Sequence, residues 1–85
     1  MRRIFGLWNR SYGIKWVLAV DQEEAIACAV ARKAIRNRHS FRRIVDLTDV
    51  EVEADPTLEP VLSANRSGVL TKGDDGSWLI DNKPI

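Results

Sequence analysis

The sequence has few of the residues on which protein chemistry usually depends. Its 85 residues include one cysteine, Cys28, and one histidine, His39. A single cysteine cannot form an internal disulfide, and the apolar neighbours of Cys28 indicate a small buried side chain. No cysteine or carboxylate stands at ligand spacing around His39, so we expect no zinc site. The sequence therefore predicts neither a metal nor a cofactor.

Long apolar runs are also missing. The longest run, Ala25–Ala31, is far shorter than a membrane span. After Met1, Arg2 and Arg3 the apolar stretch reaches only from Ile4 to Trp8, which is too short for the core of a signal peptide. We therefore expect no membrane association and a cytoplasmic location.

The sequence shows no recognisable catalytic pattern. The glycines are scattered and form no phosphate-binding loop. The acidic residues between positions 46 and 55 alternate with apolar ones, which is typical of a strand, and the turn at Asp74–Ser77 lacks the ligand spacing of a calcium loop. No nucleophile stands beside a general base, so we expect no enzyme.

What the sequence does have is the composition of a folded domain and an uneven distribution of charge. Hydrophobic residues make up 45% and charged residues 29%, and the length fits a single domain over residues 1–85. Residues 1–43 carry ten basic and three acidic residues, a net charge of +7, whereas residues 44–85 carry three basic and nine acidic residues, a net charge of −6. This division predicts two electrostatic faces.

The clearest element is a helix over about 21–38. Asp21 and Glu24 have the spacing of a capping box, and alanines with basic residues fill the rest. The helical period places Ile26, Cys28, Val30 and Ile35 on an apolar face with Ala27, Ala31 and Ala34, and leaves Ala25 and Ala29 exposed.

Alternating residues predict a β-hairpin before this helix, with strands at 2–9 and 14–20. A strand or pair of strands at 42–53, a short helix capped by Thr57 and a second hairpin at 69–72 and 77–80 follow, with a loose tail at 81–85. The sequence thus predicts an α+β fold: a small antiparallel sheet in the order β-β-α-β-(α)-β-β, with one main helix packed on one face.

Both faces of the first hairpin are largely apolar. One face is expected to meet the helix, which leaves Phe5, Leu7, Val17 and Ala19 on a face that a short chain has little material to cover. We therefore expect a non-enzymatic interaction module that forms a homodimer or another homo-oligomer through these four residues. The hairpin followed by Asp21, Glu23, Glu24, Ala25 and Ile26 resembles the start of many small bacterial domains, some antitoxin-like and some carried on mobile elements.

The alternative is nucleic-acid binding. A dense basic stretch follows the middle of the predicted helix and comprises Arg32, Lys33, Arg36, Arg38, His39, Arg42 and Arg43. Such a stretch is suited to contacts with phosphates, with the helix face as a ridge. The same arginines could instead pair with the acidic second half of the chain, and the sequence leaves these two interpretations open.

Overall fold

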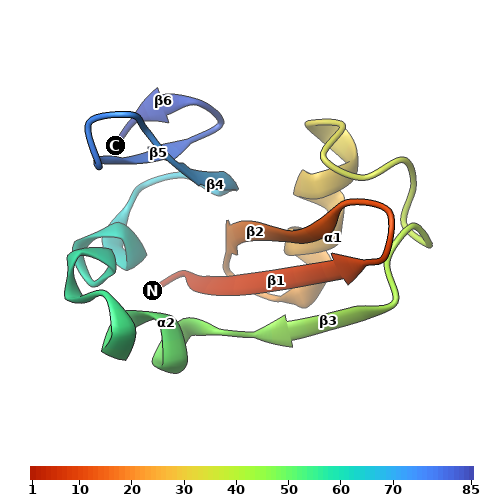
Figure 1. Ribbon diagram of the computed structural model, residues 1–85, viewed down its shortest axis with the longest axis horizontal. Helices are drawn as coiled ribbons and strands as arrows, with labels where there is room; N and C mark the ends of the chain where they lie inside the picture. Colours follow the sequence, from red (N-terminus) through yellow and green to blue (C-terminus); the bar gives the residue numbers. More distant parts are fainter.

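The computed structural model describes residues 1–85 and contains one antiparallel sheet with helices on both of its faces (Figure 1). The elements are β1 (Arg3–Asn9), β2 (Gly13–Ala19), α1 (Gln22–Ala31), β3 (Arg43–Asp46), α2 (Thr48–Ala54), the 3-10 turns η1 (Pro56–Leu58) and η2 (Pro60–Ser63), β4 (Gly68–Lys72), β5 (Trp78–Ile80) and β6 (Lys83–Pro84). The six strands lie in the order β3-β1-β2-β4-β5-β6. The predicted α+β class, with one main helix on one face of an antiparallel sheet, is confirmed.

The start of α1 is as predicted. The backbone N–H of Glu24 donates to Oδ1 of Asp21 at 2.8 Å, so Asp21 is the N-cap. In return, Oε1 of Glu24 accepts from the N–H of Val20 at 3.0 Å. This reciprocal pair ties the end of β2 directly to the first turn of the helix.

The end of α1 is not as predicted, because the helix stops at Ala31 rather than at Arg38. The N–H of Lys33 donates to the carbonyl of Val30 at 3.0 Å, and the N–H of Ala34 donates to the carbonyl of Ala29 at 2.8 Å. Lys33 itself has φ +60°. These are the bonds and the left-handed residue of a Schellman motif, with lysine at the position that glycine usually takes. A sequence without that glycine gives no local sign of the stop.

The buried face of α1 also differs from the prediction. Ala25 and Ala29 are fully buried, whereas Ala27 and Ala31 are exposed. The prediction treated Ala34 and Ile35 as part of the helix, and this rotated the expected apolar stripe away from its true position. Ile35 does reach the core, but from the chain beyond the helix.

Residues 42–53 form a strand and then a helix, not the expected strand or pair of strands. Asp46 ends β3, where its Oδ1 accepts from the N–H of Thr48 at 3.0 Å and from the Thr48 hydroxyl at 2.7 Å. The same hydroxyl accepts from the buried N–H of Ile4 at 2.8 Å. Asp49 and Glu51 then place negative charge in the first turn of α2, where the helix dipole favours it. The prediction was wrong because apolar and acidic residues alternate in α2, which is the pattern typical of a strand.

The predicted C-terminal hairpin is confirmed, but the tail after it is ordered. Asp81 and Asn82 adopt φ +54° and +63° and turn the chain into β6. The guanidinium of Arg66 donates to the carbonyls of Ile80, Lys83 and Pro84 at 3.0–3.1 Å, which holds this end in place. The expectation of a loose tail was therefore wrong.

Two small cores lie on opposite faces of the sheet. Beneath α1, the inner core contains Phe5, Leu7, Val17 and Ala19 of the hairpin with Ala25, Ile26, Cys28, Ala29 and Ile35. On the other face, the outer core contains Ile4, Leu18, Leu70 and Ile80 of the strands beneath Leu58, Val61, Leu62 and Ala64. Leu58, Val61 and Leu62 belong to two 3-10 turns, which replace the short helix that the sequence predicts, and Asp55, rather than Thr57, caps the first of them. None of the helices combines the length and apolar character needed to cross a membrane.

Candidate interaction surfaces

The four residues expected to form a self-association face lie in the inner core. Leu7, Val17 and Ala19 have no exposed area and Phe5 keeps only 8%, because α1 packs directly over them. The prediction recognised correctly that these residues share one side of the hairpin, but it assigned α1 to the wrong side. They are therefore unavailable to a partner, and the open apolar face must be sought on the opposite side of the sheet.

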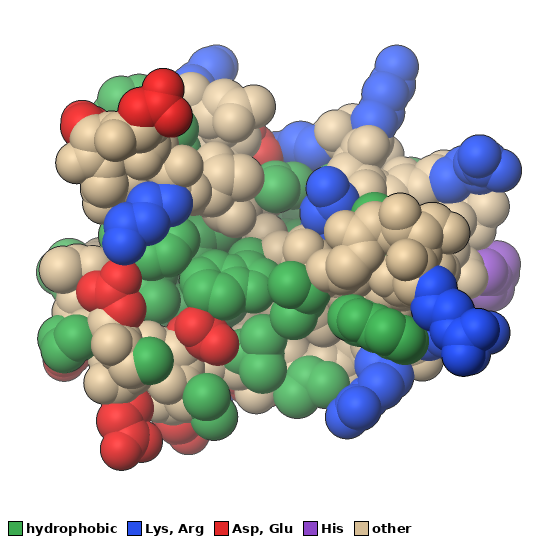
Figure 2. Space-filling model, viewed as in Figure 1, with side chains coloured by type: hydrophobic (Ala, Val, Ile, Leu, Met, Phe, Trp, Pro, Cys, Tyr) green, Lys and Arg blue, Asp and Glu red, His purple; other side chains and the backbone are tan.

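That opposite side is only partly covered. The 3-10 turns shelter the outer core near one end, whereas the strands β3, β1 and β2 face outward at the other end (Figure 1). Trp8 of β1, Ile14 of β2 and Val45 of β3 are exposed by 39%, 48% and 38%. Figure 2 shows hydrophobic side chains gathered in the middle of this face.

The register of the strands brings these side chains together. Trp8 pairs with Ile14 on one side and with Arg43 on the other, and Gly6 pairs with Trp16 and Val45. A Cβ at Gly6 would lie 2.6 Å from Cδ1 of Leu47 and 2.9 Å from Cδ1 of Ile14, so the absent side chain leaves room for both. The result is a shallow hollow of about 330 Å³ lined by Gly6, Trp8, Ile14, Arg43, Val45 and Leu47. We call the apolar side chains of this group, Trp8, Ile14, Val45 and Leu47, the open face.

Two tryptophans separate the open face from the outer core. The rings of Trp16 and Trp78 stack with centroids 5.8 Å apart and an interplanar angle of 19°. The indole N–H of Trp78 donates to the Thr57 hydroxyl at 3.0 Å, and the Lys72 ammonium lies 5.1 Å from the centre of the Trp78 ring. These two indoles therefore pack against the outer core and contribute mainly to the fold.

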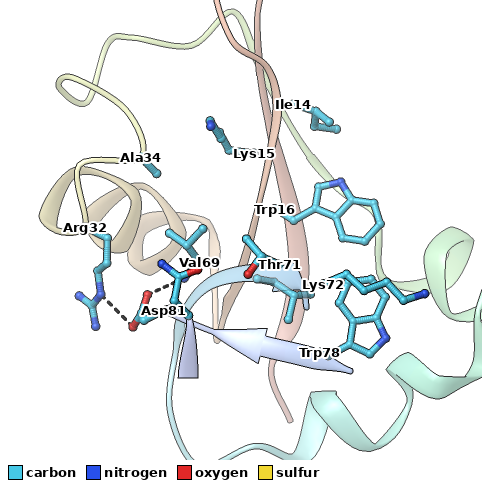
Figure 3. Close-up of a pocket in the computed structure, with 12 residues that line it drawn as sticks. Ile14, Lys15, Trp16, Arg32, Ala34, Val69, Thr71, Lys72, Trp78 and Asp81 are labelled. Atoms are coloured by element: carbon cyan, nitrogen blue, oxygen red, sulfur yellow. Dashed lines mark hydrogen bonds and ion pairs between the residues drawn. The ribbon is translucent and has the colours of Figure 1, made fainter. Parts of the chain in front are cut away.

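A larger groove of about 680 Å³ lies where β2 and β4 diverge, because the two strands pair only at residues 16–18 and 68–70. In Figure 3, Lys15 and Lys72 extend in different directions and Arg32 turns toward Asp81. The Nε of Arg32 lies 3.1 Å from Oδ2 of Asp81. Since the cations of this groove do not converge on one point, the groove has no centre of positive charge for an anion.

The basic stretch expected to form a ridge is not on one helix face, because α1 ends before it. Within it, Arg32 is paired with Asp81 and Arg38 lies 3.7 Å from Oε2 of Glu23. The other basic residues of the stretch, Lys33, Arg36, Arg42 and Arg43, are exposed and have no carboxylate within 4.0 Å, and His39 is exposed beside them. The acidic second half of the chain thus pairs with only Arg32 of this stretch.

The uneven charge of the sequence is also uneven in space. Lys and Arg side chains lie mostly toward one end of the long axis and Asp and Glu side chains toward the other (Figure 2). The acidic end includes Asp49, Glu51 and Glu53 of α2, and the long axis measures 30 Å. Because this length is about three Debye lengths at 0.1 M salt, each end presents its own charge to an approaching partner.

The carboxylates with perturbed pKa values serve the fold. Burial alone would raise the pKa of Asp46, but hydrogen bonds from Arg3 and Thr48 outweigh it and lower that pKa. Hydrogen bonds from the Ser67 hydroxyl and the Val20 amide lower the pKa of Glu24. Each of these partners comes from a neighbouring element, so the carboxylates connect elements rather than face a cavity.

The structure assembles no group of three or more His, Cys, Asp or Glu side chains that could hold a metal ion. Comparison with known proteins also gives no assignment, because no family model, no curated protein and no solved structure matches this chain.

Proposed function

We propose that this protein is a non-enzymatic interaction module of the cytoplasm that self-associates through its open face. The observation that carries the proposal is the exposure of Trp8, Ile14 and Val45 side by side on an otherwise packed sheet. Single exposed apolar residues are common on protein surfaces, but adjacent ones that line a hollow are typical of an interface. A second copy supplies a surface of matching shape and composition.

The charges of the two ends favour one arrangement of the two copies. When two identical faces pack together, the two-fold axis lies in the interface. If that axis runs across the long axis of the molecule, the basic end of each copy lies over the acidic end of its partner. The alternative, with the axis along the molecule, places like charges together and is disfavoured by repulsion. We therefore propose an antiparallel homodimer with an apolar centre and attractive ends.

The proposal is tested by measuring the mass of the protein in solution by light scattering over a range of concentrations. We expect a species of twice the 9.6 kDa chain mass. Ile14→Lys should produce a monomer, because the new ammonium would be buried in the apolar centre of the interface.

Val20→Lys is the matched control. Val20 is 51% exposed, close to the 48% of Ile14, but lies at the far end of the hairpin outside the open face. This variant should remain dimeric. A wild-type protein that stays monomeric at millimolar concentration would refute the proposal, as would equal dissociation of both variants.

Salt separates the apolar and electrostatic parts of the interaction. Attraction between exposed ends weakens as the Debye length falls from about 10 Å at 0.1 M to about 3 Å at 1 M salt. The dimer dissociation constant should therefore rise with salt. If the association only strengthens with salt, the result would support the apolar contact but contradict the antiparallel arrangement.

A further inference from the structure

The chain that follows α1 carries positive charge that the fold does not neutralise. Five cations of this segment and of the β1–β2 turn are exposed and have no carboxylate within 4.0 Å. They are Lys33, Arg36, Arg42 and Arg43 in the segment after α1 and Arg10 in the β1–β2 turn. In the rest of the molecule, most cations have partners within the protein. Arg3, for example, lies 2.8 Å from Asp46, and Arg66 donates to three carbonyls.

A hollow of about 670 Å³ lies between the β1–β2 turn and the segment after α1, and two of these cations line it. Lys33 and Arg36 line it together with the polar side chains of Asn9, Ser11, Tyr12 and Ser40. Its wall is fixed in place, because the carbonyl of Ser40 accepts from the Tyr12 hydroxyl at 2.6 Å and from Nδ2 of Asn9 at 3.2 Å. The hollow is therefore formed in the absence of a ligand, and binding of an anion would not require these side chains to become ordered.

The backbone at the edge of this hollow is strained. Lys33 has φ +60°, a conformation that costs an L-residue with a side chain about 1–2 kcal/mol. Glycine would end α1 at a lower cost, yet the chain has a lysine there. Strained residues concentrate at binding sites, where the surrounding structure holds them in place. The Schellman end of α1 holds Lys33 in this conformation, and the strained residue lies at the same place as the unneutralised charge.

We propose that this hollow and the cations beside it bind the sugar-phosphate backbone of a nucleic acid. A single small anion would leave Arg10 and Arg42 unused, whereas a chain of phosphates can contact several cations in succession. Arginine predominates in the group, and its planar guanidinium matches a phosphate in geometry.

A membrane surface fits this end of the molecule less well. Peripheral membrane binding combines basic residues with apolar side chains that enter the lipid. Residues 33–43 include no exposed large hydrophobic side chain.

This interaction does not depend on self-association. Tyr12 and Ala34, which line the hollow, pack against the inner core beneath α1. The open face lies on the other side of the sheet. The hollow therefore remains accessible in the proposed homodimer, and the two proposals can fail separately.

Fluorescence anisotropy with labelled single-stranded DNA, single-stranded RNA and duplex DNA tests the proposal. The wild-type protein should bind at least one of them, with an affinity that falls steeply as salt rises. For a single strand, each lost phosphate contact should reduce the slope of log affinity against log salt by about 0.7. If the variant and the wild type bind equally at about 1 M salt, this change of slope is an eightfold loss of affinity at about 50 mM salt. Lys33→Ala and Arg36→Ala should each show this change.

Lys83→Ala is the control, because Lys83 is an exposed cation in β6 without a carboxylate partner, far from the hollow. Its affinity and salt slope should remain those of the wild type. Lys33→Gly adds a variant that cannot lose binding through unfolding, because it relieves the strained backbone while it removes the charge. It should bind as weakly as Lys33→Ala.

Three outcomes would overturn the proposal. They are no binding of any of the three nucleic acids at about 50 mM salt, equal losses for the Lys83 and Lys33 variants, and equally tight binding of polyglutamate or of vesicles rich in phosphatidylserine. The last result would show a general response to negative charge and would exclude a nucleic-acid site.

Discussion

Replacing Lys33 with glycine should make the protein more stable. The left-handed conformation of Lys33, with φ +60°, costs about 1.5 kcal/mol relative to an allowed conformation. Glycine removes this cost but gives the unfolded chain more freedom, which offsets about 0.7 kcal/mol of the gain. Loss of the favourable interaction between the lysine charge and the helix dipole costs about 0.3 kcal/mol more, which is the size usual for such a charge. A net stabilisation of about 0.5 kcal/mol remains, which corresponds to a rise in melting temperature of about 3 °C for a chain of this size.

Lys33→Ala separates backbone strain from charge. Lysine near the end of a helix interacts favourably with the helix dipole, and both substitutions lose this contribution of about 0.3 kcal/mol. Alanine keeps the Cβ that causes the strain, so Lys33→Ala should be no more stable than the wild type. Thermal unfolding followed by circular dichroism compares the three proteins. If Lys33→Ala stabilises the fold as much as Lys33→Gly, or if neither variant is more stable than the wild type, the left-handed backbone at Lys33 does not cost the fold stability.

Three further predictions concern the contacts that hold the elements together. Thr48→Val should reduce the free energy of unfolding by about 2 kcal/mol, because the buried Ile4 amide loses its only acceptor; Thr48→Ser keeps the hydroxyl and should lose less than half of that in urea unfolding. Asp46→Asn should destabilise the protein at pH 7. Because the folded pKa of Asp46 lies below its ordinary value, the ionised carboxylate stabilises the fold above about pH 4, and this stabilisation is lost as the pH falls through the folded pKa. The urea midpoints of the wild type and of Asp46→Asn should therefore converge in acid. A difference between the two midpoints that does not change with pH would contradict this role of the Asp46 carboxylate. Gly68→Ala should destabilise by about 2 kcal/mol, since the new Cβ would lie 2.6 Å from the carboxyl carbon of Asp81; the loss should shrink in an Asp81→Ala background, and strict additivity would argue against this contact.

Local signals in the sequence predicted the elements whose ends depend on their own residues. The Asp21–Glu24 spacing located the start of α1, because a capping box is formed entirely by neighbours in the chain. Alternation located both strands of the first hairpin to within a residue or two. The stop of α1 was missed because every residue from Arg32 to Arg36 is compatible with a helix and the left-handed position carries lysine.

Other features depend on contacts between distant parts of the chain. Residues 48–54 alternate as a strand does, and α2 forms there because Asp46 and Thr48 satisfy each other and the Ile4 amide. Alternation also shows which hairpin residues share a side, but not which side α1 covers. Since both sides are apolar, the sequence could not distinguish the buried side with Phe5 from the open side with Ile14. The expected interaction residues were therefore placed in the core.

The Asp81 carboxylate joins three regions that are distant along the chain. It accepts from the Val69 amide at 2.9 Å and from the Arg32 guanidinium at 3.1 Å, so the final turn of the sheet meets the last residue before the strained Lys33. Any event that detaches the C-terminus beyond Ile80, such as proteolytic trimming, would also free Arg32 and leave the turn after α1 without its outside support. The last five residues of the chain thus bear on the shape of the hollow lined by Lys33 and Arg36, to which they contribute no side chain.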